Sequence, residues 1–397
     1  MTDHREVVIL SAVRTAIGKY GGALKDFPPT DLGATVAREA MKRAGVAPAD
    51  VEHVVFGNVI HTEPKDMYLS RVVAVKSGMP VETPALTVNR LCGSGLQAVV
   101  SAAQIVQLGH ADVAVAGGAE SMSRGQYWIG GMRWGQRMNH AAVIDAMVGA
   151  LTDPFDDVHM AITAENVARK WGISREDQDA LAVESHRRAV DATKHCVFKG
   201  QIVPIEMKTK SGPVMFDTDE QPRADTTIEA LAKMKPAFDK NGTVTAGNAS
   251  GINDGAAAVV LMEANAAEQR GFKPIGRLVD YSVVGVDPKY MGIGPVPAVR
   301  KLLARTGMGL DDIDVFEVNE AFAAQALAVV RDLRLPMEKT NPNGSGIGLG
   351  HPVGATGAIL TVKLLHELHR AGGRFGLVTM CIGGGQGIAA IFERIES

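Results

Sequence analysis

The chain has 397 residues, 46% of them hydrophobic and 21% charged, with a formal net charge of −3 at pH 7. This length exceeds that of an average single core and favours two or more domains, and the composition is typical of a globular protein. The basic residues are scattered, and no run of apolar residues is long enough to span a bilayer. We therefore expect neither a nucleic acid nor a membrane as a partner.

The chain contains three cysteines, Cys92, Cys196 and Cys381. Such an odd and sparse set argues against a disulfide framework and for a reducing compartment. The first residues enter a strand pattern at once, which leaves no room for a targeting segment. Together these observations predict a cytoplasmic protein.

In chain order, short β-branched runs alternate with helical patterns. Val7–Leu10, Val54–Phe56 and Val113–Ala116 are typical of buried strands. Thr30–Ala44 and Gly95–Leu108 have the spacing of helices. This alternation predicts an α/β fold with a largely parallel sheet.

The two ends of the chain resemble each other. Both contain an amphipathic helix followed by a short apolar strand that ends at an Asn-bearing loop. One offset of 262 residues (Asp50 to Asp312) relates Ala47–Asn58 to Gly309–Glu320, Gly95 to Gly357, and Val115 to Leu377. A single offset shared by several elements predicts a duplicated domain.

The segment between the repeats differs in character, because it holds all three tryptophans, more charge and less strand pattern. Ser174 and Asp177 resemble a capping box that opens a helix reaching about Ala192. We interpret this segment as an inserted loop domain that covers the substrate site. The expected division is an N-terminal half (1–121, completed by 252–273), a loop domain (122–251) and a C-terminal half (274–397).

The first motif that could carry chemistry is Asn89–Gln104. Here Cys92 follows a strand-like run and lies at the start of a helix, among glycines that would let an acyl group approach the backbone. Unpaired N–H groups and the partial positive charge at a helix start favour a thiolate. The alternative for this residue alone is an inert cysteine in a tight turn.

Three further motifs carry polar residues at strand-to-helix junctions. His351 follows a glycine run whose spacing does not fit a dinucleotide loop. Cys381 precedes three glycines that would expose successive N–H groups, as an oxyanion hole requires, and Asn319 ends a strand. A structural histidine, a plain turn and a helix cap are the separate alternatives. Because sites in α/β sheets form at the carboxyl ends of strands, one shared site explains all four motifs together.

These motifs resemble the signatures of the thiolase family over essentially the whole chain. The matching segments, in order, are NRLCGSGLQAV, GNASGINDGAAAVV, VNEAFAAQ, GLGHPVGATG and CIGGGQG. The chain is most similar to the bacterial biosynthetic acetyl-CoA acetyltransferases and, among these, to the broad-range β-ketothiolases linked to polyhydroxyalkanoate synthesis. The resemblance implies a duplicated, five-layered αβαβα core with an inserted loop domain, assembled as a homotetramer that is a dimer of dimers.

The resemblance also implies catalytic roles. Cys92 would be the acylated nucleophile and His351 would take its proton. Cys381 would remove a proton from the α-carbon of the second acyl-CoA. Asn319 would hold a water that stabilises the enolate together with His351, and the N–H groups of Cys92 and Gly383 would bind the other oxyanion.

Further positions match residues that contact the substrate in the family. In the loop domain Ala161 replaces the usual glycine of an H-M-G motif, and the loop before His351 departs from the family pattern at Ser345, Gly346 and Gly348. Those departures leave the packing around His351 open. The carried-over residues are His159, Met160, Ser250, Arg223 and Leu151 for coenzyme A, and Met291 and Phe322 for the acyl pocket.

The implied reaction is the reversible condensation of acetyl-CoA with a short acyl-CoA, or the thiolysis of a short 3-ketoacyl-CoA. Coenzyme A would be a substrate and product, no cofactor would be bound permanently, and no metal-ligand spacing is present. The alternatives are a ketoacyl synthase or hydroxymethylglutaryl-CoA synthase of the same fold, and a non-catalytic acyl-CoA-binding protein. The second cysteine favours a thiolase over the synthases.

Overall fold

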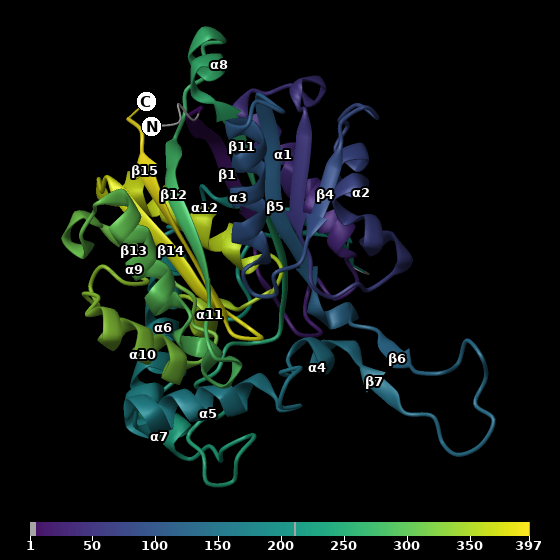
Figure 1. The fold of residues 1–397 in the computed structure, drawn as a ribbon, viewed down its shortest axis with the longest axis vertical. Helices are drawn as coiled ribbons and strands as arrows, with labels where there is room; N and C mark the ends of the chain where they lie inside the picture. Colours follow the sequence, from purple (N-terminus) through teal and green to yellow (C-terminus); the bar gives the residue numbers. More distant parts are fainter. Residues whose placement is uncertain (1–4, 210–211, 397) are drawn as a thin grey trace.

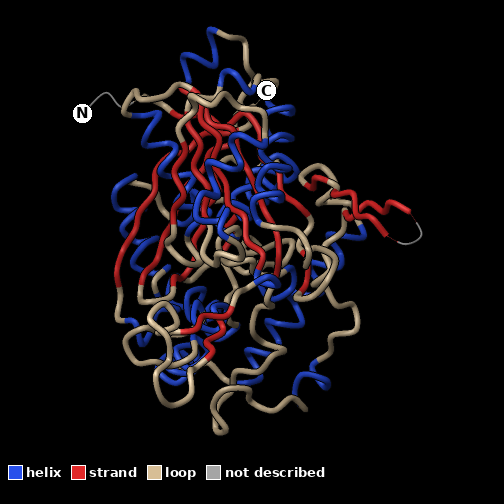
Figure 2. The backbone as a smooth tube through the Cα atoms, turned by 90° about the vertical axis from the view of Figure 1, so that its right-hand side faces the viewer, coloured by secondary structure: helices blue, strands red, loops and turns tan. Residues whose placement is uncertain are grey.

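A mixed sheet of 11 strands forms the centre of the computed structural model, which describes residues 5–209 and 212–396. Figure 2 shows the long strands running together above a part made mainly of helices and loops. The strands in spatial order are β13 (Val315–Val318), β14 (Phe375–Ile382), β15 (Gln386–Arg394), β12 (Gly276–Gly285), β1 (Val7–Thr15), β11 (Asn253–Glu263), β5 (Val113–Ser121), β3 (His53–Gly57) and β4 (Ala85–Val88), with β2 (Gly18–Lys19) on β11 and β8 (Ile202–Val203) on β1.

The sheet consists of two half-sheets that barely join. Only two residue pairs connect β1 with β12, Val8 with Arg277 and Ile9 with Gly276. In spatial order, one half-sheet therefore comprises β1, β11, β5, β3 and β4, and the other comprises β12, β15, β14 and β13. A register shift interrupts the pairing of β1 with β11 after Ile9, and another interrupts the pairing of β12 with β15.

The helices complete five layers (Figure 1). One outer layer, α1 and α2, packs on the first half-sheet, and α9 packs on the second, next to α10. Between them, α3 and α12 contact each other and strands of both half-sheets. This αβαβα order confirms the expected fold. The bounds are α1 (Pro29–Ala44), α2 (Leu69–Lys76), α3 (Ser94–Gln107), α8 (Ala264–Gln269), α9 (Pro295–Thr306), α10 (Ala323–Leu333) and α12 (Thr356–Ala371).

The structure confirms the duplication element by element. The 262-residue offset relates the start of α3 to that of α12, and the start of β5 to that of β14. Both α1 and α9 begin with proline in the first turn, where the missing N–H is harmless. They end at Gly45 and Gly307, whose φ angles of 70° and 72° favour glycine.

The prediction of a largely parallel sheet is wrong. β11, β12 and β15 pair antiparallel with all their neighbours, and β1 pairs antiparallel with β11 and β12. Parallel pairing links β3 with β4 and β5, β13 with β14, and β1 with the short β8. Every residue of β1 and β11 is buried. A strand buried on both faces lacks polar alternation in either orientation, so its sequence does not reveal its direction.

The segment between β5 and β11 contributes β8 to the main sheet, and its other described elements lie outside that sheet. The predicted helix after Ser174 is present as α6, and the Ser174 hydroxyl accepts a hydrogen bond from the Asp177 N–H at 3.1 Å. A hairpin of β6 and β7 extends away from the body (Figure 1). The bounds are β6 (Tyr127–Ile129), β7 (Val143–Asp145), α4 (Ala146–Ala150), α5 (Met160–Trp171), α6 (Arg175–Lys194), β9 (Ile205–Thr209), β10 (Gly212–Phe216) and α7 (Ile228–Ala232).

Candidate active site

Cys92 lies in a tight turn between β4 and α3. The preceding Leu91 has a φ of 44°, a left-handed conformation that L-residues rarely adopt. Side chains hold this turn: the Ser94 hydroxyl donates to the Leu91 carbonyl at 2.7 Å, and Asn89 Oδ1 accepts from the Leu91 N–H at 2.9 Å. The turn thus fixes Cys92 at the start of α3, as the motif predicts.

The helix start does not by itself lower the pKa of the Cys92 thiol. Burial raises the pKa of the Cys92 thiol, and the charge of Glu120 adds to that rise. The N–H groups of Gly383 and of Cys92 itself lower the pKa of the thiol, but by less than burial raises it. Removal from water outweighs the helix-end effect, so a base is needed to take the thiol proton.

His351 is buried and held at three of its atoms. Its backbone N–H donates to Asn253 Oδ1 at 2.9 Å, and Nδ1 lies 2.6 Å from the Thr356 hydroxyl. That hydroxyl donates its proton to the Pro352 carbonyl at 2.9 Å, so it accepts from a protonated Nδ1. Nε2 is then the basic nitrogen, 3.4 Å from Asn319 Nδ2. Burial lowers the pKa of His351 to about 4, which keeps the ring neutral at pH 7.

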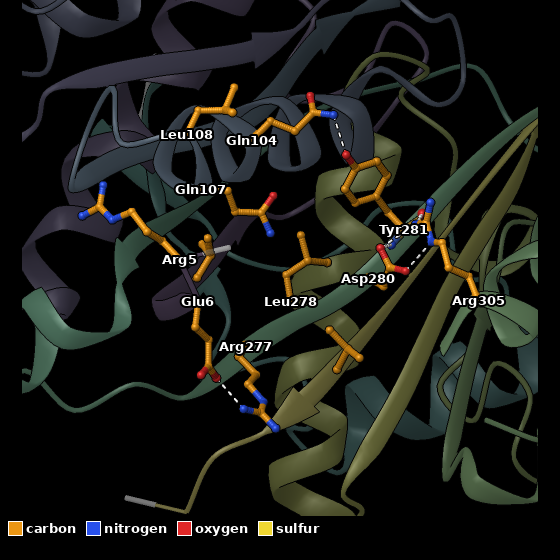
Figure 3. A pocket seen from close by; sticks show the side chains of 12 residues that line it. Arg5, Glu6, Gln104, Gln107, Leu108, Arg277, Leu278, Asp280, Tyr281 and Arg305 are labelled. Atoms are coloured by element: carbon orange, nitrogen blue, oxygen red, sulfur yellow. Dashed lines mark hydrogen bonds and ion pairs between the residues drawn. The ribbon is translucent and has the colours of Figure 1, made fainter. Parts of the chain in front are cut away.

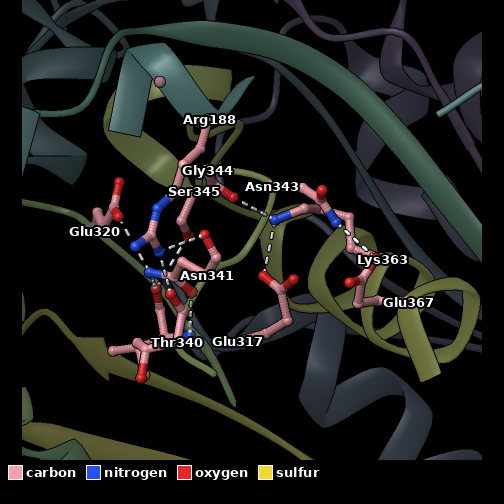
Figure 4. Close-up of polar contacts among 12 residues, drawn as sticks. Arg188, Glu317, Glu320, Thr340, Asn341, Asn343, Gly344, Ser345, Lys363 and Glu367 are labelled. Carbon is pink, nitrogen blue, oxygen red and sulfur yellow. Dashed lines mark hydrogen bonds and ion pairs between the residues drawn. The ribbon is translucent and has the colours of Figure 1, made fainter. Parts of the chain in front are cut away.

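The loop before His351 packs on α6 of the loop domain. The short helix α11 (Gly346–Leu349) directs the Gly348 N–H to the Ser185 hydroxyl at 3.0 Å, and that hydroxyl donates to Glu320 Oε2 at 2.6 Å. Ser345 donates to the Val318 carbonyl at 3.0 Å. Figure 4 shows Glu320, Asn341 and Ser345 converging on this contact beside Arg188. Gly348 therefore lets the loop pack closely against α6, whereas the Ser345 hydroxyl binds β13.

Gly348→Ala is expected to destabilise the protein by about 1–3 kcal/mol, because overpacking forces neighbours to move. A Cβ at position 348 would lie 2.4 Å from the Ser185 carbonyl oxygen, inside α6. Thermal and denaturant unfolding of the purified variant measures the loss. Gly285→Ala is the matched control, because its Cβ would meet no atom closer than 3.9 Å. Equal stability of the two variants would contradict this packing.

Cys381, at the end of β14, is fully buried in an apolar cluster that contains Met160, Met291 and Phe322. Burial raises the pKa of the Cys381 thiol well above its ordinary value, and the neighbouring Cys92 raises it further. Met160, Met291 and Phe322 also line a cavity with Cys92, which places both cysteines in one site. Asn319 is fully buried, and no described residue hydrogen-bonds its side-chain oxygen.

Most of the residues named from the sequence surround one cavity of about 340 Å³. Asn319 and Cys381 lie behind its wall, in contact with wall residues. Arg223 is exposed and does not line the cavity; its backbone N–H donates to His186 Nδ1 at 3.3 Å. The named residues that line the cavity are Cys92, His351, Gly383, His159, Met160, Leu151, Ser250, Met291 and Phe322.

The cavity wall on the loop-domain side includes a residue that the motifs did not reveal. Phe238 stacks on the His159 ring, with centroids 4.1 Å apart and planes inclined by 11°. His159 Nδ1 accepts the Ala161 N–H at 3.1 Å and so caps α5. Asn253 and Thr356 were missed in the same way, although both stand inside recognised motifs, because hydrogen bonding to His351 depends on the folded geometry.

A larger depression of about 980 Å³ lies between α3 and β12 (Figure 3). Charged side chains dominate one end of it, and Glu6 and Arg277 pair with each other there. None of the catalytic or substrate-binding residues named from the sequence lines it. We assign the chemistry to the smaller cavity, because Cys92 and the neutral His351 line it and Cys381 lies behind its wall.

No group of three or more His, Cys, Asp or Glu side chains suited to a metal ion occurs within residues 5–209 and 212–396. In the same described part of the chain, no helix has both the length and the apolar character needed to cross a membrane.

The chain is similar to known proteins over nearly its whole length. It matches the N-terminal domain of thiolase over residues 7–265 and the C-terminal domain over residues 272–394. It is 64% identical to Beta-ketothiolase BktB of Cupriavidus necator over 392 residues, which cover 98% of this chain and 100% of that protein. These matches do not favour a ketoacyl synthase-type enzyme or a non-catalytic binding protein.

Solved structures agree. The crystal structure of the Bacillus anthracis acetyl-CoA acetyltransferase superimposes with a TM-score of 0.97 at 48% identity and covers 99% of both chains. Human mitochondrial 3-ketoacyl-CoA thiolase in complex with CoA gives a TM-score of 0.96 at 45% identity, over 99% of this chain and 98% of that one. The chain therefore belongs to the thiolase family and is an acyltransferase.

Proposed function

We propose that this thiolase is an acetyl-CoA C-acyltransferase that cleaves or forms the C2–C3 bond of short 3-ketoacyl-CoA through an acyl-Cys92 intermediate. The observation that carries the proposal is the shared cavity of Cys92, His351 and Gly383, with Cys381 in the apolar cluster behind it. Such a site lets one cysteine carry the acyl group while the other handles the proton of the carbon acid.

In the thiolysis direction, His351 Nε2 takes the Cys92 proton and the thiolate attacks C3. The C2–C3 bond breaks, its electron pair passes to the acetyl-CoA enolate, and Cys381 protonates C2. Free CoA then gives its thiol proton to Cys381, attacks the acyl-Cys92 thioester and releases the shortened acyl-CoA, and His351 returns its proton to the Cys92 sulfur. Condensation reverses these steps. Because each product leaves before the next substrate reacts, the kinetics should be ping-pong.

Two sets of donors would stabilise the developing negative charges. The N–H groups of Cys92 and Gly383 are suited to the oxyanion on C3. His351 and Asn319, which lie together at 3.4 Å, are suited to the enolate oxygen, with a water held by Asn319. A single preorganised donor of this kind is typically worth about 10²–10³ in rate.

The proposed loop domain comprises residues 122–251. It would hold coenzyme A against the two thiolase halves, which we propose as residues 1–121 completed by 252–273, and residues 274–397. His159 and Phe238 form a stacked wall of the cavity. The Met160 N–H donates to the Leu151 carbonyl at 2.8 Å, and the Ser250 N–H donates to the Ala321 carbonyl at 3.0 Å. We propose that Ser250 and the stacked wall contact the pantetheine arm and that Leu151 lies near the nucleotide end. The exposed Arg223 would lie near the nucleotide end.

Thiolysis of acetoacetyl-CoA with free CoA tests this function. Steady release of acetyl-CoA, with parallel lines in a two-substrate kinetic analysis, is expected. A decarboxylating synthase or a binding protein would release no acetyl-CoA, so a failure to release acetyl-CoA would refute the proposal.

The acyl pocket should also admit one more methylene, so 3-ketovaleryl-CoA should be cleaved with a kcat/KM within about a hundredfold of acetoacetyl-CoA. The support is the buried pair Met291 and Phe322, since methionine repacks around ligands of different shape, and one methylene is worth about 1–3 kcal/mol. 2-Methylacetoacetyl-CoA should be poor, because its methyl crowds the carbon that Cys381 reaches. A larger loss with 3-ketovaleryl-CoA would indicate a strict acetoacetyl-CoA thiolase.

We further propose a homotetramer, assembled as a dimer of dimers through the β6–β7 hairpin. Its apolar side chains are exposed, Trp134 at 89% and Met138 at 78%, and such a surface marks an interaction site. Light scattering should give about four times the chain mass of 41.9 kDa. Combined Trp134→Ser and Met138→Ser substitutions should yield about half that mass. A monomeric mass for the unaltered protein would refute the proposal.

The setting we propose is the cytoplasm, with a role in fatty acid metabolism or polyhydroxyalkanoate synthesis. The support is the set of three free cysteines, Cys92, Cys196 and Cys381, and the similarity to Beta-ketothiolase BktB.

A further inference from the structure

A carboxylate that has no place in the proposed chemistry lies close to the nucleophile. Glu120, near the end of β5, is fully buried, and its charge influences the Cys92 thiol. Oε1 accepts from Asn58 Nδ2 at 3.0 Å and from the Ile60 N–H at 3.1 Å. Oε2 accepts from the Val59 N–H at 3.0 Å and from the Gly354 N–H at 2.8 Å.

These donors come from different halves of the molecule. The segment 58–60 follows β3 in the first half, whereas Gly354 lies between His351 and α12 in the second. Ile60 and Val353, which flank the Glu120 contacts, pack in one apolar cluster with Met122, and Cys92 packs against that cluster. Glu120 thus joins the segment beside the nucleophile to the segment that carries the base.

The internal repeat gives this contact a counterpart. The 262-residue offset places Gly354 opposite Cys92, each two residues before the first residue of a central helix. After β14, the Gly383 N–H acts on the Cys92 thiol at the start of α3. Near the end of β5, the Glu120 carboxylate accepts from Gly354 at the start of α12. Each contact thus links the start of one central helix to the end of a strand in the other half.

We propose that Glu120 is a positioning residue for acyl transfer, which keeps the 352–354 turn, and with it His351 and Val353, aligned with Cys92. The inference rests on the proposed roles of Cys92 and His351. Glu120 does not touch the reacting atoms and acts through the two segments that it joins.

Glutamine cannot replace this carboxylate. All four partners are donors, and two of them meet each oxygen, so an amide would turn its own N–H₂ group toward two N–H groups. Burial raises the pKa of Glu120 to about 8, while three backbone N–H groups oppose the rise. The hydrogen bonds fit the anion, because a protonated oxygen would likewise face donors.

The test compares Glu120→Gln and Glu120→Asp with the control Asp66→Asn. Asp66 is an equally buried carboxylate that follows the 58–60 segment, but among the described residues it accepts only from Thr62 and Glu63, both in the first half. Each full-length variant is assayed for thiolysis of acetoacetyl-CoA. Mass spectrometry gives the fraction of Cys92 that acetyl-CoA acetylates, so that kcat is expressed per reactive site, and thermal unfolding is recorded in parallel.

For Glu120→Gln, kcat per reactive site should fall about 10-fold to 100-fold, since small displacements of catalytic groups cost that much, while KM changes less than about threefold. The Glu120→Asp side chain is one methylene too short to reach the Gly354 N–H, so its kcat should fall by a similar factor. If Glu120→Gln does not fold, the kcat of Glu120→Asp tests the inference. Asp66→Asn should lower the unfolding temperature and keep kcat per site within about twofold. An unchanged kcat in the folded Glu120 variants, or an equal loss in Asp66→Asn, would overturn the inference. Absence of thiolysis by the unaltered protein would instead refute the proposed function.

Discussion

Cys92→Ala should abolish thiolysis, with kcat/KM about 10³-fold or more below that of the unaltered enzyme. The reason is that alanine leaves no atom to carry the acyl group, and neither Cys381 nor Cys196 can take over. Cys381 points into an apolar cluster with a strongly raised pKa, and Cys196 is exposed. Acetoacetyl-CoA cleavage by purified variants measures the effect.

Cys196→Ser is the matched control for this experiment. Cys196 follows α6 and has a left-handed φ of 56°, outside every motif, so its replacement should leave kcat/KM within about twofold. The nucleophile assignment is falsified if Cys92→Ala keeps thiolysis within tenfold of the unaltered enzyme. A large kinetic loss in Cys196→Ser would show instead that the loop domain acts on catalysis through this turn.

Cys381→Ser should separate the two half-reactions. Acetyl transfer from acetyl-CoA to Cys92 needs the thiolate and the base, so the variant should still become acetylated, although more slowly. Condensation also needs proton removal from a weakly acidic methyl group. A serine hydroxyl is too weak an acid to cycle as Cys381 does, and condensation should collapse by about 10³-fold or more.

The two half-reactions of Cys381→Ser are followed separately, by acetyl-enzyme formation and by acetoacetyl-CoA release. Cys381→Ala serves as the control for the added hydroxyl, which in this cluster beside Met291 and Phe322 would itself be unfavourable. Both variants should behave alike. Normal condensation by either one would remove Cys381 from the mechanism, and loss of acetylation would place it in the first half-reaction as well.

The fold could be predicted from the sequence because both repeats carry the same local signals at the ends of their helices. Pro29 and Gly45 open and close α1 as Pro295 and Gly307 open and close α9, and such helix-terminal signals depend on few neighbours. Strand direction could not be predicted, since β1 and β11 are buried throughout and carry no polar alternation. It is decided by which strands lie side by side after the chain returns from the loop domain.

The site likewise has parts that the sequence predicts and parts that only the folded structure reveals. The cavity is lined by residues that short motifs single out, such as Cys92 and His351. The groups that hold them, Thr356, Asn253 and Glu120, act through contacts across 5, 98 and 234 residues of chain. Those contacts exist only after folding. The direction of the Cys92 pKa shift also required the structure, because burial competes with the helix start and its extent is a tertiary property.

Covalent labelling of the acetyl-enzyme tests the central claim most directly. The protein is incubated with acetyl-CoA without an acceptor, quenched in acid, digested and analysed by mass spectrometry. The account predicts one acetyl group per chain, on the peptide that contains Cys92, and its loss when free CoA is added. An acetyl group on Cys381 or Cys196 that CoA removes, or no acetyl-enzyme at all during active turnover, would contradict it.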